Sequence, residues 1–113
     1  MGRVIDAGDC LVTPPFIDPH FHLDSTLSLG EPRLNQSGTL LEGIQLWGEL
    51  KPHLTGDAIK QRVRELARWS IAKGTLAIRS HVDTSDPRLL NVDALIEVRE
   101  ELKPYIDIQL VAF

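Results

Sequence analysis

The segment FIDPHFHLD, residues 16–24, is a short apolar run that ends in two histidines one residue apart. In an extended strand, residues i and i+2 point to the same face, so His20 and His22 would present two imidazoles side by side. Two Cα atoms at that spacing lie roughly 7 Å apart, and both rings can then reach one metal ion, whose usual chemistry is the activation of water. The alternative interpretation is two polar residues on the exposed face of an edge strand. The pattern makes His20 and His22 candidate metal ligands.

The residues around the pair indicate where it lies on the strand. Pro14-Pro15 marks the start of the strand, and Phe16-Ile17 is typical of its buried part. After Leu23-Asp24 the chain enters residues 25–37, a long loop rich in Ser, Gly, Pro, Asn and Gln. The histidines therefore fall at the carboxyl end of the strand, where α/β folds keep their active sites. A loop that follows such a strand would lie over the mouth of a pocket.

Two helices are predicted after this loop, over residues 39–50 and 57–73, because apolar residues recur there at helical spacing. Thr55 is a suitable N-cap for the second helix, and Lys73-Gly74 is typical of its end. The predicted apolar stripe of the first helix comprises Leu40, Ile44, Trp47 and Leu50.

Strands and a third helix complete the pattern. Residues 75–83 and 107–113 are predicted strands, and a helix between them would open at Asp86-Pro87 and stop before Pro104. The fold class is therefore α/β, with two consecutive βαβ units joined by right-handed crossovers. Because closing a barrel takes about eight strands, this βαβαβ pattern is expected to be the opening part of a (β/α)₈ barrel.

The second predicted strand also ends in polar residues. His81 and Asp83 alternate with Val82, so they would share a face at the same pocket mouth as the first histidine pair. They could orient ligands or substrate from behind the site. The alternative is a His–Asp hydrogen bond that only ties the loop.

Composition excludes several classes of partner. The net charge of −4 over 113 residues provides no basic surface for nucleic acid or an anionic membrane. No apolar run approaches the ~18 residues that span a bilayer, and no signal peptide is visible. The single cysteine, Cys10, cannot form an internal disulfide, and a small buried apolar role is expected for it. A cytoplasmic location fits these features.

Beyond these patterns, the sequence resembles the amidohydrolase superfamily. Residues 12–24 resemble the first-strand signature of that superfamily, and residues 35–44, 79–83 and 106–113 resemble its cytosine deaminase branch. The resemblance implies that residues 1–13, predicted as two small strands around a Gly-Asp turn, are part of a small β-sandwich. Residues 14–113 would then be the first three strands and intervening helices of a metal-dependent hydrolase barrel.

The resemblance also implies roles for individual residues. His20 and His22 would bind one divalent metal ion, Fe²⁺ or Zn²⁺, and Leu40 would contact a small N-heterocyclic substrate. His81 and Asp83 would sit behind the metal site. No catalytic acid or base is assigned within the chain, since the family's acid/base glutamate would follow Phe113. We therefore expect the 113 residues alone to be inactive.

Three functions stay open from the sequence. The first is part of a hydrolytic deaminase acting on cytosine or a related aminopyrimidine. The second is an amidohydrolase acting on isocytosine, an aminotriazine or a similar heterocycle. The third is a non-catalytic interaction domain whose open sheet edge recruits another copy or the remainder of the barrel. The other zinc deaminase class is excluded because it needs a Pro-Cys-x-x-Cys motif and this chain has one cysteine.

Overall fold

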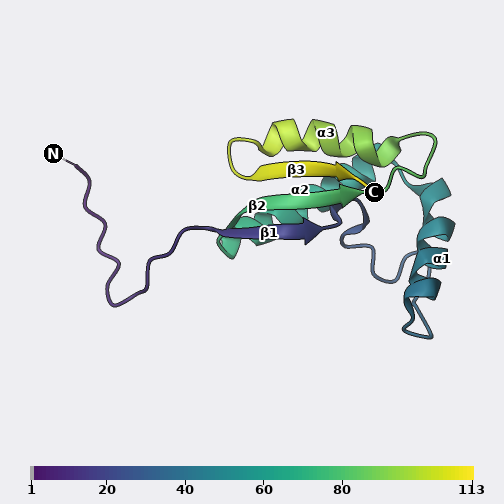
Figure 1. Cartoon of the computed structure of the whole chain (residues 1–113), viewed down its shortest axis with the longest axis horizontal. Coiled ribbons are helices and arrows are strands. Elements are labelled where there is room, and N and C mark those ends of the chain that lie inside the picture. The colour runs from purple at the N-terminus through teal and green to yellow at the C-terminus, as the bar shows by residue number, and fades with distance from the viewer. Residues whose placement is uncertain (1) are drawn as a thin grey trace.

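The computed structural model describes residues 2–113, which form a three-stranded parallel sheet in the order β1-β2-β3, with α-helices between the strands (Figure 1). The predicted βαβαβ order and α/β class are confirmed. The elements are β1 (Phe16–Phe21), η1 (Leu23–Ser25), α1 (Leu40–Leu50), η2 (Lys51–His53), α2 (Gly56–Ala72), β2 (Thr75–Val82), α3 (Leu90–Leu102) and β3 (Asp107–Ala112).

All three strands end at the same edge of the sheet because they run parallel (Figure 1). β2 and β3 pair without interruption up to Val82 and Ala112. The pairing continues past the strand ends, since the Phe113 amide donates to the Val82 carbonyl and the Thr84 amide donates to the Phe113 carbonyl. The strand exits that carry the candidate site residues are therefore neighbours.

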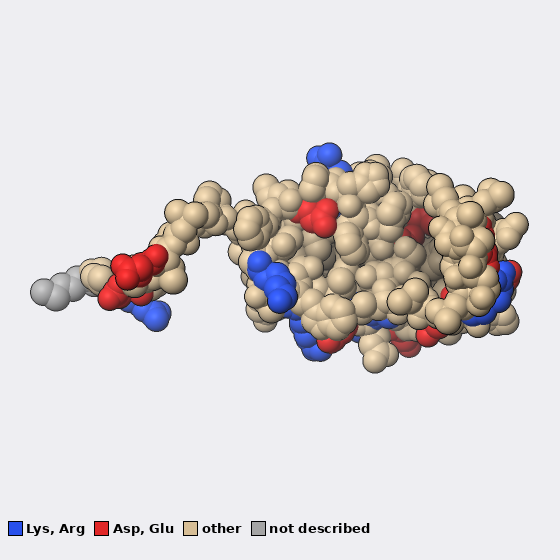
Figure 2. Space-filling model, turned by 90° about the horizontal axis from the view of Figure 1, so that it is seen from below, with Lys and Arg blue, Asp and Glu red and all other residues tan. Residues whose placement is uncertain are grey.

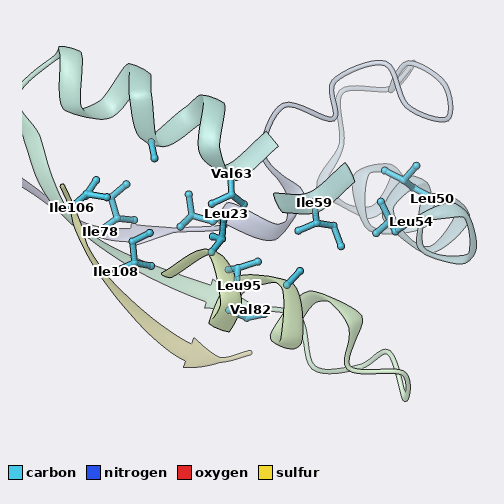
Figure 3. Packing of buried hydrophobic residues seen from close by; sticks show 13 residues of the cluster. Leu23, Leu50, Leu54, Ile59, Val63, Ile78, Val82, Leu95, Ile106 and Ile108 are labelled. Atoms are coloured by element: carbon cyan, nitrogen blue, oxygen red, sulfur yellow. The ribbon is translucent and has the colours of Figure 1, made fainter. Parts of the chain in front are cut away.

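The hydrophobic core lies between the sheet and helices α2 and α3. Leu23, just beyond β1, is completely buried among side chains from both helices and the sheet (Figure 3). Burying a leucine side chain contributes about 2 kcal/mol, so the core fixes the exit of β1 against the helices. The other core residues are Leu50, Leu54, Ile59, Val63, Ala67, Ile78, Val82, Ala94, Leu95, Val98, Ile106 and Ile108.

The opposite face of the sheet is open in the described part of the chain. Phe16 and Ile17 are 63% and 70% exposed, so the prediction that they are buried is wrong. The sequence pattern of a strand buried on both faces presupposes a second covering layer. Here β1 is an edge strand, and the helices of residues 2–113 cover the face that holds Ile78 and Val82.

The amino-terminal tail, residues 2–15, is extended and forms no strand, so the two predicted strands there are wrong (Figure 2). The predicted Gly-Asp turn is present, with Asp6 accepting from the Gly8 amide. Cys10 is exposed rather than buried. Two short strands are not stable without a sheet to pack on, which explains the difference. The assignment of residues 1–13 to a β-sandwich stays a prediction, and Met1 lies outside the described residues.

Helix α2 has its predicted N-cap, because the Thr55 hydroxyl accepts from the Ala58 amide. Helix α3 begins at Leu90, later than the predicted start at Asp86-Pro87. The Asp86 carboxylate bonds the backbone and guanidinium of Arg88, and Leu89 takes a positive φ of 50°. This local side-chain bonding forms a turn that competes with the first helical turn.

Helix α1 stands at the carboxyl edge of the sheet and does not lie on its face (Figure 1). The predicted core stripe is therefore wrong in part, since Leu40 and Ile44 are 80% and 58% exposed. Leu46 and Leu50 are buried, and Trp47 packs partly against the core. Among residues 2–113, no helix has both the length and the apolar character that crossing a membrane requires.

Candidate functional site

The first histidine of the pair lies in a bulge of β1. Asp18 pairs with Ile78 and Phe21 with Ser80, so Pro19 and His20 both face a single residue of β2. Pro19 has no amide to donate, and the His20 amide donates to the Asp18 carboxylate at 3.1 Å instead of joining the ladder. Bulges of this kind redirect a side chain, and here the redirected side chain is His20.

Three imidazoles lie together at the carboxyl edge of the sheet. The ring centroids of His20 and His22 are 5.4 Å apart. His81, from the end of β2, stacks on His20 at 4.0 Å with an interplanar angle of 22°. His81 is 5.8 Å from His22. The structure therefore brings together the two predicted ligands and one of the two residues predicted behind them.

The donors present match part of a catalytic metal site. Within residues 2–113, no group of three or more His, Cys, Asp and Glu side chains is arranged to hold a metal ion. His20 and His22 supply two imidazole donors, one fewer than the three protein ligands of a catalytic zinc site. His81 Nδ1 is buried and has no hydrogen-bond partner among these residues. The donor chemistry fits a divalent metal, with further ligands required from elsewhere.

Phe113 is a site neighbour that the sequence patterns did not single out. Its ring meets His22 edge-on, with centroids 5.1 Å apart and an interplanar angle of 70°. The same ring lies 6.4 Å from that of His81. The only sequence signal for Phe113 is its place at the end of an apolar strand, β3, which pairs with the strand that carries His81. Phe113 forms an apolar wall beside the imidazoles.

A pair of hydrogen bonds ties the exits of β1 and β2 together. The Leu23 amide donates to the Ser80 hydroxyl at 3.0 Å, and the Asp83 amide donates to Asp24 Oδ2 at 2.8 Å. Asp24 is 2% exposed, and burial raises the pKa of its carboxyl above the ordinary value. Neither Ser80 nor Asp24 was predicted as a site residue. Both hold the histidine segment in place.

The Asp83 side chain faces α1, and no hydrogen bond joins it to His81. Its Oδ2 accepts from Trp47 Nε1 at 2.7 Å and lies 2.7 Å from Lys51 Nζ. Its Oδ1 accepts from the Ser85 hydroxyl. Burial alone would raise the pKa of the Asp83 carboxyl. The bonds from Lys51, Ser85 and Trp47 outweigh burial and hold this pKa well below its usual range. Asp83 thus contacts the helix that faces the site.

A pocket of about 730 Å³ opens at this edge of the sheet. It is lined by His22, Leu40 and Asp83, together with Phe113 and residues from the loop 25–37. The predicted position of that loop at the pocket mouth is confirmed. A pocket of this size with a few convergent polar groups is typical of small-molecule sites.

Glu42 holds the loop 25–37 to the start of α1. The Ser37 hydroxyl donates to the Glu42 carboxylate at 2.6 Å, and the amides of Ser37 and Gln36 donate at 2.7 and 3.1 Å. Arg33 adds an ion pair at 2.8 Å. These bonds lower the pKa of Glu42 to about 2, and the bond from the Ser37 hydroxyl makes the largest contribution. The loop and the first turn of α1 form one unit.

With this geometry in view, comparison with known proteins defines the class. The amidohydrolase family matches residues 3–113, and the chain belongs to that family. N-Isopropylammelide isopropyl amidohydrolase of Pseudomonas sp. (strain ADP) is 36% identical over 118 residues, covering 96% of this chain and 28% of the relative. Pterin deaminase of Rhizobium rhizogenes is 30% identical over 109 residues, covering 95% of this chain and 25% of the relative.

Solved structures place the chain more narrowly. It is similar to 5-methylcytosine deaminase from Klebsiella pneumoniae liganded with phosphonocytosine, with a TM-score of 0.90, 41% identity and coverage of 98% of this chain and 28% of that chain. The same enzyme liganded with 5-fluorocytosine gives a TM-score of 0.87 at 44% identity, over 88% of this chain and 24% of that chain. The similarity agrees with the predicted cytosine deaminase branch. The chain spans about a quarter of the length of these relatives.

Proposed function

We propose that residues 14–113 supply the first metal-binding side of a hydrolytic deaminase that acts on cytosine or a related amino-substituted pyrimidine. The observation that carries the proposal is that the rings of His20 and His22 lie 5.4 Å apart at the carboxyl edge of the sheet, with His22 lining the pocket. A metal-binding histidine pair at this position suits a hydrolase of C–N bonds, and the family membership supports that reaction class.

In this proposal His20 and His22 hold one divalent ion, Fe²⁺ or Zn²⁺, which when bound lowers the pKa of water towards ~7 and makes hydroxide available at neutral pH. Phe113 packs edge-on against His22 and forms an apolar side of the site there. Leu40 of α1, which lines the pocket, contacts the heterocycle through its backbone or side chain. His81 packs against His20 and restrains its ring. No residue among 2–113 is assigned as the acid or base that moves protons.

An aminotriazine or a similar heterocycle is the second candidate substrate. The observation that favours it is the 36% identity to an enzyme named for N-isopropylammelide. The 5-methylcytosine deaminase structures favour the pyrimidine instead, at 41–44% identity. The third possibility considered for the chain, a non-catalytic interaction domain, predicts no turnover in any assembled form.

A chimera tests the proposal directly. Residues 2–113 replace the structurally matching part of the Klebsiella 5-methylcytosine deaminase, to which they are similar over 98% of their length. Ammonia release is measured from cytosine, 5-methylcytosine and an aminotriazine, with the His20→Ala, His22→Ala chimera as the matched control. We expect deamination of at least one heterocycle that the control lacks.

The chimera also defines the outcome that would overturn the proposal. If it folds and binds one equivalent of metal yet releases no ammonia from any of the three, the proposed function is wrong. The 113-residue chain assayed alone should release none, because two imidazoles are fewer than the three protein ligands of a catalytic metal site.

A further inference from the structure

Asp83 connects the end of β2 to α1 at the edge of the pocket. Its carboxylate contacts the indole N–H of Trp47 and the ammonium group of Lys51, each at 2.7 Å. The Asp83 side chain is 13% exposed and that of Lys51 is 22% exposed, so water screens this ion pair less than a surface pair. The backbone of Asp83 is itself fixed, through its amide, to Asp24.

The other contacts that hold α1 to the body of the molecule lie at the same end of the helix, where Leu46 and Leu50 are buried. Within residues 2–113, α1 packs on no strand or helix as extensively as α2 and α3 pack on each other. Its apolar residues Leu40, Leu41 and Ile44 are exposed. The ion pairs of Arg33 with Glu42 in the first turn of α1 and with Glu49 in its last turn join the loop to the helix and not to the sheet.

The anchor lies at one end of α1 and the predicted substrate contact at the other. Seven residues separate Trp47 from Leu40, which is about 10 Å along a helix. A tilt of α1 by about 10° about the Trp47 end would therefore move Leu40 by about 2 Å, given the helical rise per residue. This displacement is about half the thickness of an aromatic ring. The contact of Asp83 with Trp47 and Lys51 therefore governs how closely Leu40 approaches a heterocycle.

We propose that Asp83 is a positioning residue that sets the width of the pocket by holding α1, and thereby controls the affinity for the heterocycle. This deepens the proposed function and depends on it for its kinetic consequence. It assigns to Asp83 a different task from the predicted one behind the metal site. The geometry carries the assignment, because the Asp83 carboxylate contacts Trp47 and Lys51 of the α1–η2 segment and makes no hydrogen bond to an imidazole.

Fluorescence of the 113-residue chain tests the anchor without any activity. Trp69, the other tryptophan, is replaced by phenylalanine so that the emission reports Trp47 alone. Asp83→Ala should shift the Trp47 emission to longer wavelength, since the indole loses its partner and gains exposure. Glu49→Gln is the matched control, because it removes an ion pair of α1 that does not reach the sheet. An unchanged spectrum for folded Asp83→Ala would overturn the proposal.

Kinetics in the chimera separate the two tasks of Asp83. Asp83→Asn should raise KM about tenfold, with kcat and bound metal within about twofold of the parent. Trp47→Phe breaks the same anchor from the helix side, so it should raise KM in the same direction even if Asp83→Asn folds poorly. A fall in kcat or metal content with unchanged KM would overturn the proposal. A parent chimera that folds and binds metal but is inactive refutes the proposed function, while the Trp47 emission still decides the anchor.

Discussion

His20 and His81 stack face to face, with ring centroids 4.0 Å apart and an interplanar angle of 22°. They come from the ends of different strands, and the bulge at Pro19 and His20 brings one ring over the other. The stack fixes the plane of the His20 imidazole. If His20 binds a metal ion, the stack would orient it as hydrogen-bond partners orient other metal-binding histidines, whose loss costs roughly 10–100-fold in metal affinity or activity.

The stack leads to a prediction about metal binding. His81→Ala should weaken Zn²⁺ binding by about tenfold, because the His20 ring loses the surface that orients it. His81→Phe keeps a flat ring at the same place and should retain most of the affinity. Isothermal titration of the chain with Zn²⁺ measures both. Equal losses in the two variants would show that a nitrogen of His81 binds the metal itself.

Asp18 should support Zn²⁺ binding through the hydrogen bond that its carboxylate accepts from the His20 amide. Asp18→Ala removes the acceptor that stabilises the bulge, so His20 turns away and Zn²⁺ affinity falls by about tenfold. Asp18→Asn retains an acceptor oxygen and should remain within about threefold of the parent. The same titration provides the comparison. If Asn and Ala behave alike, the charge of Asp18 and not its hydrogen bond is responsible.

Leu23 is expected to be a major determinant of stability. It is completely buried between β2, α2 and α3, and Leu23→Ala should lower the free energy of unfolding by about 2–5 kcal/mol. Leu29, which is 94% exposed, is the matched control, and Leu29→Ala should change it by no more than about 0.5 kcal/mol. Urea unfolding followed by circular dichroism measures both. A small effect at Leu23 would mean that the core relaxes around the cavity.

Glu42 predicts an acid-sensitive loop. Its pKa is about 2 in the folded chain and 4.5 ordinarily, so the folded state binds fewer protons than the unfolded state between these values. The bonds to the Ser37 hydroxyl and the Ser37 and Gln36 amides are therefore fully present above pH 4.5 and are lost as the pH falls towards 2.

A carboxyl NMR titration tests this prediction. The Glu42 signal should titrate near pH 2, and Ser37→Ala, which removes the largest cause of the shift, should move the midpoint back towards 4.5. Glu101 is the control, because the distant Arg64 guanidinium lowers its pKa, and its signal should not respond to Ser37→Ala. An ordinary midpoint for Glu42 in the parent would show that the loop is not held to α1.

The helices over 40–50 and 56–72 and the three strands were predictable because their signals are local. Periodic apolar residues, an N-cap at Thr55 and a Gly at 74 act through neighbours in sequence. The exceptions have local causes as well, since Asp86 forms a turn with Arg88 in place of the first turn of α3. The prediction of two strands within residues 2–15 is wrong because a strand needs a partner strand, which the local sequence cannot supply.

The sequence by itself determined that two histidines end a parallel strand, because the alternation of side chains along a strand and the direction of a βαβ unit are local rules. Only the tertiary structure decided which side chains meet them. The bulge that aims His20, the contact of His22 with Phe113 and the turning of Asp83 towards Trp47 depend on register and on the placement of α1. Those quantities are set by packing between segments distant in the chain, and no spacing of residues encodes them.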